Sequence, residues 1–388
     1  MVTAAIPKKR ILSVDVLRGL VMIVMALDHV RDFFHISAQT ADPLDLGTTT
    51  PILFFTRWIT HFCAPTFVFL SGVSAYLSAE NKTLQTVSSF LMKRGLWLVI
   101  VDLVLISFAL TFNPSYNLVM LTVFWAIGCS MIFLGLILKI TPKLVLPLGL
   151  LIFISHDLVS AANIPAGGTA EFALKVLFTG IYVIPVTPSH FIGFFYAIVP
   201  WSGVMFLGYG LGNHIRNRKT LFILGISLLL LFFLLRFINQ YGEPKPWQLQ
   251  GNFLNTILSF VNTTKYPPSL QFLSMTLGVA LLLLACIPNS SSRFNKIISV
   301  YGRVPFFYFV MHLFLAHLLL VGAFFITGHT TQEIRDTASP ILFRPRDFGF
   351  SLPIVYLVWI SVVLVLYYPC KWFYKYKVNS KKWWLRYL

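Results

Sequence analysis

The sequence predicts an all-α polytopic membrane protein in which one domain, residues 1–388, forms a bundle of about ten transmembrane helices. Hydrophobic residues make up 57% of the chain and charged residues only 11%, whereas a soluble domain carries about 25% charged residues. Apolar runs long enough to cross a bilayer recur along the whole chain. These observations exclude a soluble globular fold.

The apolar runs define the predicted spans, because a helix needs roughly 18 or more apolar residues to cross the hydrocarbon core. The runs that meet this requirement lie at 11–36, 51–79, 90–112, 117–138, 144–160, 189–212, 220–238, 267–287, 299–327 and 351–373. The stretch 171–187 is moderately apolar but is interrupted by Gly180 and Pro185. It is either an interfacial or re-entrant piece or an eleventh span.

Basic residues are concentrated in alternate segments between the spans. Lys93, Arg94 and the segment 371–386 belong to the basic set, whereas 37–50 and 113–116 hold no Lys or Arg. Because basic loops stay on the cytoplasmic side, we expect residues 1–10 and a basic, aromatic tail at 374–388 to be cytoplasmic. This topology accounts for the net charge of +17 and predicts a lipid bilayer, and no nucleic acid, as partner.

The cysteines and the N-terminus carry little functional signal. The four cysteines stand alone in apolar stretches and form no CxxC pair, which is typical of small buried side chains and not of metal ligands or disulfides (Cys63, Cys129, Cys286 and Cys370). The segment 1–10 is basic, but the apolar run after it contains charges and no A-x-A cleavage site. We therefore predict a retained first helix and not a cleaved signal peptide.

The first span carries an unusual number of ionisable side chains, namely Asp15, Arg18, Asp28, His29, Arg31 and Asp32. Positions 15, 18, 22, 25, 29 and 32 share one helical face. A polar face of this kind is costly in lipid, so it must line a cavity enclosed by the other helices. Within it, His29 lies near Asp28 and Asp32, and nearby carboxylates orient an imidazole and raise its basicity, as a general base requires.

Later spans add polar groups at both ends of this cavity. Arg57 and His61 lie one turn apart near the outer end of the second span, where Arg57 is either a clamp for an anionic group or the partner of an acidic residue on the first span. His312 lies near mid-membrane in the ninth span. Asp102, inside the third span, is expected to pair with an arginine of the bundle.

At the cytoplasmic end, basic side chains form a predicted collar for a phosphate-bearing ligand: Arg18, Lys93, Arg94 and Arg303. Arg18 and Asp15 could instead form a buried ion pair between helices. The long outer loops, at 161–188, 239–266 and 328–350, are more typical of functional lids than of simple connections.

Several segments resemble a bacterial multi-pass family related to the heparan-α-glucosaminide N-acetyltransferase catalytic domain. They are RILSVDVLRGLVMIVMALDHVRDFF, RWITHFCAPTFVFLSG, PWSGVMFLGYGLG, TKYPPSLQFLSMTLG and GRVPFFYFVMHLFLAH, and the likeness runs from about residue 10 to 375. The family's first motif matches Ser13, Asp15, Arg18 and Gly19, and its second matches Pro65, Phe67, Val68, Phe69 and Gly72.

The resemblance implies transfer of an acyl group, usually acetyl, from cytoplasmic acyl-CoA to an acceptor at the outer face of the bacterial inner membrane, without a metal. His29 stands where lysosomal relatives carry Asn, and His35 is the nearest candidate for their catalytic histidine. His61 replaces an acidic residue of those relatives, so the active-site chemistry can be rearranged and the acceptor need not be an amino sugar.

The resulting hypothesis places acyl-CoA between the first, second and ninth spans, with its phosphates near Arg18, Arg94 or Arg303 and its thioester at His29 and His61. One imidazole would deprotonate a hydroxyl or amine of a small-molecule or glycan acceptor, and a second imidazole or Arg57 would stabilise the oxyanion. Direct transfer and an acyl-histidine intermediate both stay open.

Two other functions fit the same residues. A proton-coupled small-molecule transporter would use the buried His–Asp pairs as a proton relay, and a non-catalytic receptor or scaffold would bind a lipid or sugar in the polar cavity. The sequence also leaves a homodimer open, because no stripe of small residues dominates a lipid-facing surface.

Overall fold

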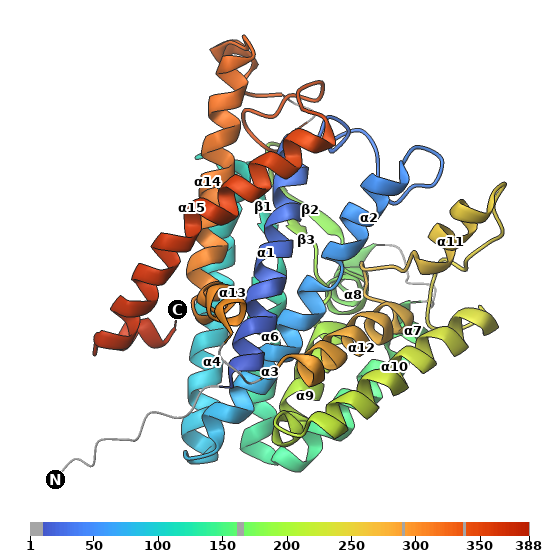
Figure 1. Cartoon of the computed structure of the whole chain (residues 1–388), viewed down its shortest axis with the longest axis vertical. Coiled ribbons are helices and arrows are strands. Elements are labelled where there is room, and N and C mark those ends of the chain that lie inside the picture. Colours follow the sequence, from blue (N-terminus) through green and yellow to red (C-terminus); the bar gives the residue numbers. More distant parts are fainter. Residues whose placement is uncertain (1–10, 161–166, 289–291, 337–338, 388) are drawn as a thin grey trace.

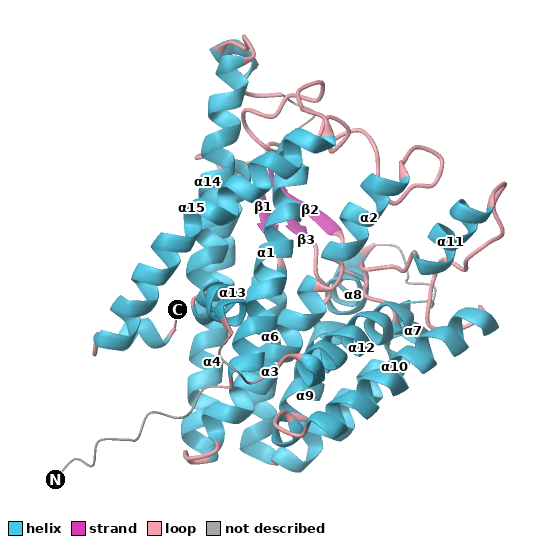
Figure 2. Cartoon of the chain, in the orientation of Figure 1, coloured by secondary structure: helices cyan, strands magenta, loops and turns pink. Residues whose placement is uncertain are grey.

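The computed structural model describes residues 11–160, 167–288, 292–336 and 339–387, so the predicted cytoplasmic segment 1–10 lies outside the described residues. The chain is mostly helical (Figures 1 and 2). Helix α1 (Leu12–Phe34) runs through the middle of the bundle and contacts α2, α3, α13, α14 and α15. Its central place explains why its polar face is enclosed and does not meet lipid.

Helices α1 and α13 (Arg293–Arg303) cross at very short range. A Cβ at Gly19 would overlap the carbonyl of Ile298, and one at Gly302 would overlap the carbonyl of Asp15. Glycine at both positions lets the two backbones touch, which is how tightly packed membrane helices approach each other.

Two predicted spans are each divided into two helices. The second span consists of α2 (Pro51–Thr60) and α3 (Cys63–Ala79), with the break at His61 and Phe62. The ninth consists of α13 and α14 (Pro305–Ile326), because Pro305 can begin a helix but cannot continue one. The break in the second span therefore lies ahead of Pro65, which is in the first turn of α3.

The third span contains α4 (Leu84–Val101), a π-helical turn (Asp102–Ile106) and α5 (Ser107–Thr111). The carboxylate of Asp102 accepts hydrogen bonds from the backbone N–H and hydroxyl of Thr122, at 2.6 and 2.7 Å, and from the N–H of Trp125 at 2.9 Å. It thus satisfies the free N–H groups at the start of α6 (Val123–Ile140). The prediction of an arginine partner for Asp102 was wrong.

A small sheet interrupts the helical fold, so the all-α prediction was wrong in this part. Strands β1 (Leu118–Leu121), β2 (Tyr182–Thr187) and β3 (His190–Phe194) lie in the order β1–β3–β2, with β1 parallel and β2 antiparallel to β3. The predicted spans at 117–138 and 189–212 begin as strands, and 171–187 contains α8 (Gly168–Leu174), a π-helical turn and β2. Short apolar runs do not distinguish a strand from a buried helix.

The other helices are α7 (Val145–Ser160), α9 (Ile198–Gly210), α10 (Arg218–Ile238), α11 (Phe253–Val261), α12 (Leu270–Cys286) and α15 (Leu352–Asn379). Among the described residues, 7 helical stretches are long and apolar enough to cross a membrane: Pro51–Ala79, Leu84–Thr111, Val123–Ile140, Pro142–Val159, Arg218–Ile238, Pro305–Ile326 and Leu352–Asn379. Helices α9 and α12 are apolar but shorter. The chain is thus an integral membrane protein, and the number of spans stays a prediction.

Candidate functional site

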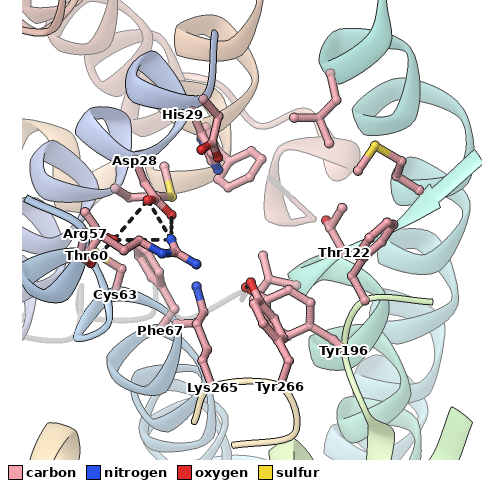
Figure 3. Close-up of a pocket in the computed structure, with 18 residues that line it drawn as sticks. Asp28, His29, Arg57, Thr60, Cys63, Phe67, Thr122, Tyr196, Lys265 and Tyr266 are labelled. Carbon is pink, nitrogen blue, oxygen red and sulfur yellow. Dashed lines mark hydrogen bonds and ion pairs between the residues drawn. The ribbon is translucent and has the colours of Figure 1, made fainter. Parts of the chain in front are cut away.

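A cavity of about 260 Å³ lies beside the polar face of α1 (Figure 3). It is also lined by α2, α3, the start of α6, α14 and the loop between α11 and α12. Asp28, His29 and Asp32 of α1 all face it. We call it the central cavity.

An ionic cluster forms one wall of the central cavity. The Asp28 carboxylate lies 2.5 Å from the Arg57 guanidinium and 3.0 Å from that of Arg31, and it accepts a hydrogen bond from the hydroxyl of Thr60 at 3.0 Å. Arg57 is therefore the partner of an acidic residue on α1, one of the two roles expected for it. Arg31 also pairs with Asp32 at 2.5 Å.

Two histidines from helices far apart in sequence meet at this cavity. His29 Nδ1 lies 2.7 Å from His312 Nε2, and His312 Nδ1 lies 3.1 Å from the Tyr308 carbonyl oxygen. A carbonyl oxygen can only accept a hydrogen bond, so His312 Nδ1 carries the proton and donates to it. The Nε2 of the neutral His312 ring then accepts a hydrogen bond from the Nδ1–H of His29. This network leaves His29 Nε2 as an unprotonated acceptor, and the His29 ring lines the central cavity.

Lys265 and Tyr266 stand across the central cavity from His29 (Figure 3). Among the described residues no ion pair involves Lys265, whose ammonium lies 6.0 and 5.1 Å from the ring centres of Tyr196 and Tyr266. The sequence interpretation did not select these three residues. For Lys265 and Tyr266 the only signal was a lysine next to an aromatic residue at the predicted outer entry of a span, in TKYPPSLQFL, and Tyr196 had no signal of this kind.

The loop that carries Lys265 is held by Glu243. Its carboxylate accepts hydrogen bonds from the backbone N–H of Thr264 at 2.9 Å and from the hydroxyl of Ser269 at 2.7 Å. Burial raises the pKa of Glu243, and these hydrogen bonds oppose the shift. The two ends of the loop are thus tied to one buried side chain.

A smaller cavity of about 90 Å³ adjoins the central cavity, and we call it the lower cavity. Both are lined by Phe67, Val123 and Phe309, so they meet at these side chains. Arg18 and Arg94 line the lower cavity, and the buried Nε of Arg94 has no hydrogen-bond partner among the described residues.

The predicted basic collar is only partly assembled at the lower cavity. Lys93 is exposed and lies outside the lining. Arg303 packs on the Tyr374 ring at 4.9 Å and lies 3.7 Å from Asp15, also outside the lining. Asp15 lies 3.5 Å from Arg18 within α1, so this ion pair does not bridge helices as expected for the alternative role, whereas the contact of Asp15 with Arg303 does.

The two other histidines expected in the site lie elsewhere. His61 is buried and faces a third cavity, with no hydrogen-bond partner for either ring nitrogen among the described residues. His35 lies just past the end of α1, with its Nδ1 2.9 Å from the Ser37 hydroxyl and outside the central cavity. His29 and His61 therefore line different cavities.

A comparison with known protein families shows to which family this chain belongs. The family model described as heparan-α-glucosaminide N-acetyltransferase, catalytic, matches residues 10–241. The chain belongs to this family. Membership indicates a membrane transferase of the acetyltransferase type. A search of curated proteins gives no match.

The matched segment contains only part of the site. It includes α1 to α3 with Asp28, His29 and Arg57, and it ends within the loop after α10. Lys265 and His312 come from the rest of the chain, although both belong to the same site. Among the described residues, no group of three or more His, Cys, Asp or Glu side chains is placed to hold a metal ion.

Proposed function

We propose that this protein is a membrane-bound acyltransferase that moves an acyl group, most simply acetyl, from cytoplasmic acyl-CoA to an acceptor at the outer face of a bacterial inner membrane. In this proposal ten helices span the membrane and both termini are cytoplasmic. The observation that carries it is the junction of the lower and central cavities at Phe67, Val123 and Phe309. The lower cavity holds Arg18 and Arg94, and the adjoining central cavity holds the His29 ring, whose Nε2 can accept a proton.

The lower cavity suits the acyl donor. Arg94 is the main proposed cation for its phosphates, because guanidinium groups bind phosphate with paired hydrogen bonds and its Nε has no partner among the described residues. Arg18 adds a second positive charge, although its guanidinium also donates to the Gly302 carbonyl and the Ser74 hydroxyl. His29 lies 11 residues further along α1 than Arg18, which is about 16 Å at 1.5 Å per residue. The pantetheine arm of CoA can cover this distance, which is shorter than the ~30 Å hydrocarbon core.

His29 is the proposed general base. Its Nε2 accepts the proton of the attacking acceptor, while its Nδ1–H remains bound to His312. The chain of hydrogen bonds through His312 to the Tyr308 carbonyl fixes the tautomer that this step needs. A base positioned in this way contributes about 10²–10⁴ in rate.

Lys265 and Tyr266 are the proposed stabilisers of the oxyanion that forms at the thioester carbon. Both line the central cavity, and Lys265 has no acidic partner among the described residues to neutralise its charge. Arg57 is less suited to this step because Asp28 already occupies its guanidinium. We assign Arg57 and Asp28 to holding α1 and α2 in place.

The test is acyl-CoA consumption by purified protein in nanodiscs. The His29→Gln variant should lose about 10² or more of the turnover, while His190→Gln, on the β2–β3 hairpin and outside the three cavities, serves as the control. The proposal fails if His29→Gln turns over like wild type. It also fails if a pH gradient drives solute flux through liposomes without any need for acyl-CoA, since that result describes a transporter.

A further inference from the structure

A third cavity, of about 480 Å³, opens beside the central cavity, and we call it the loop cavity. It is lined by residues from three loops, at 42–46, 245–246 and 262–266, and by the ends of α2 and α11. Arg57, Lys265 and Tyr266 line both the loop cavity and the central cavity, so the two cavities adjoin at these side chains, and we call this boundary the passage.

Two buried polar side chains face the loop cavity without a partner. His61 is 0% exposed and Thr263 is 2% exposed, and neither the ring nitrogens of His61 nor the Thr263 hydroxyl has a hydrogen-bond partner among the described residues. Leaving such groups unpaired is costly, so they indicate a ligand that pairs with them. A neutral imidazole and a hydroxyl each donate and accept, and sugar-type hydroxyl groups are complementary to both.

The charges at the passage select against an ammonium group. The lining of the loop cavity carries three cations, Arg57, Lys245 and Lys265, against the two carboxylates Asp42 and Asp45, and Arg57 is also paired with Asp28. Lys265 is in no ion pair among the described residues. A protonated amine moving inward would meet the like charge of Lys265, whereas a hydroxyl group would meet a hydrogen-bond donor.

We propose that the loop cavity binds an uncharged polyhydroxylated acceptor of the carbohydrate class, and that a hydroxyl of this acceptor, and not an amine, receives the acyl group. This inference rests on the proposed acyltransferase function. The hydroxyl oxygen bonds to the thioester carbon while its proton passes to His29 Nε2. The carbon–sulfur bond then breaks, the CoA sulfur takes the proton from His29, and the products are an ester and free CoA.

The test uses matched acceptors with radiolabelled acetyl-CoA: the methyl glycosides of glucose, galactose and mannose, and the same compounds with an amine at carbon 2. Alkaline hydroxylamine cleaves oxygen esters but not amides, so treatment of the isolated labelled product reports which group carries the label. We expect label that hydroxylamine releases, and a kcat/KM for the neutral glycoside at least about ten-fold above that of its amine counterpart. A hydroxylamine-resistant product, or labelling of neither series, overturns the inference.

Variants at the passage distinguish the effect of the Lys265 charge on acceptor preference from an effect on folding. Lys265→Gln should reduce the preference for the neutral glycoside by about ten-fold, while Lys265→Arg should retain it, because only the charge is conserved. Thr263→Val should raise the KM for the neutral glycoside by about five- to ten-fold, with Thr187→Val on the β2–β3 hairpin as control. An unchanged preference in Lys265→Gln contradicts the inference.

Slow hydrolysis of acyl-CoA without any acceptor tests the acyltransferase function by itself. If wild-type protein hydrolyses acyl-CoA and His29→Gln does not, yet only amines are acylated, the acceptor inference is wrong and the proposed function stands. If acyl-CoA is neither hydrolysed nor transferred, both are wrong.

Discussion

At the scale of single residues, the site depends on contacts that fix protons and charges in place. The His29–His312 pair is one of them, since a 2.7 Å hydrogen bond joins two rings whose planes lie 16° apart. The Asp28–Arg57 pair is the other, since it joins α1 to α2 inside the bundle. Each of these two pairs leads to a prediction of its own.

Replacing His312 by Gln should lower kcat by about 10²-fold, because His29 is then free to adopt the wrong tautomer. The KM for acyl-CoA should change little, because His312 does not line the lower cavity. Steady-state kinetics with His190→Gln as the control measure this split. An equal change in kcat and in the KM for acyl-CoA would show that His312 has only a structural role.

Replacing Asp28 by Asn should destabilise the protein by about 3–5 kcal/mol, because it leaves the buried guanidinium of Arg57 without its counter-charge. The double variant Asp28→Asn, Arg57→Gln should recover part of this loss, since neither charge is then buried alone. Thermal unfolding in detergent measures both effects. Additive losses in the double variant would mean that the ion pair carries no coupling.

At the scale of secondary-structure elements, close backbone contact positions α1 relative to α13. Gly302→Ala should lower the stability by about 1–3 kcal/mol, because the added methyl group overlaps the backbone of Asp15 and Gly19. Gly322→Ala in α14 is the matched control, since nothing lies within 4 Å of its Cβ position. If both variants unfold at the same temperature, α1 and α13 do not pack as described.

The sequence predicted these elements unevenly, and the reasons are physical. Ionisable residues inside an apolar run had to face a protein interior, so the polar face of α1 could be inferred, and pairing of Arg57 with an acidic residue of α1 could be inferred as one of its two expected roles. The contact between His29 and His312 could not, because nothing in a linear sequence relates the rotations of two helices. Strands β1 and β3 were missed because apolar runs next to helices have no distinguishing period.

Lys265 was missed for a related reason. It lies in the outer loop 239–266, which was predicted to be a functional lid, but Lys265 itself was given no role. In the structure it is only 8% exposed, because Glu243 holds its loop against the bundle and turns it toward the central cavity. Sequence patterns describe helices better than they describe loops whose position depends on a distant side chain.

At the scale of the whole molecule, the proposed function requires that the lower and loop cavities open on opposite sides of the membrane. In a variant without native cysteines, Asp45→Cys should react with a membrane-impermeant maleimide in intact cells, because Asp45 lines the loop cavity. Lys382→Cys should react only after the cells are opened, since basic tails stay cytoplasmic. Labelling of both sites in intact cells would contradict this topology.

The hydrogen bond between His29 and His312 joins positions 283 residues apart in the chain. A ribosome adds about 5–20 residues per second, so α1 enters the membrane roughly 15 to 60 s before α14 has been synthesised. During that interval its charged face has neither of its later neighbours from α13 and α14. We therefore expect the charged face of α1 to rely on its early neighbours α2 and α3, including the Asp28–Arg57 ion pair, until the C-terminal half arrives.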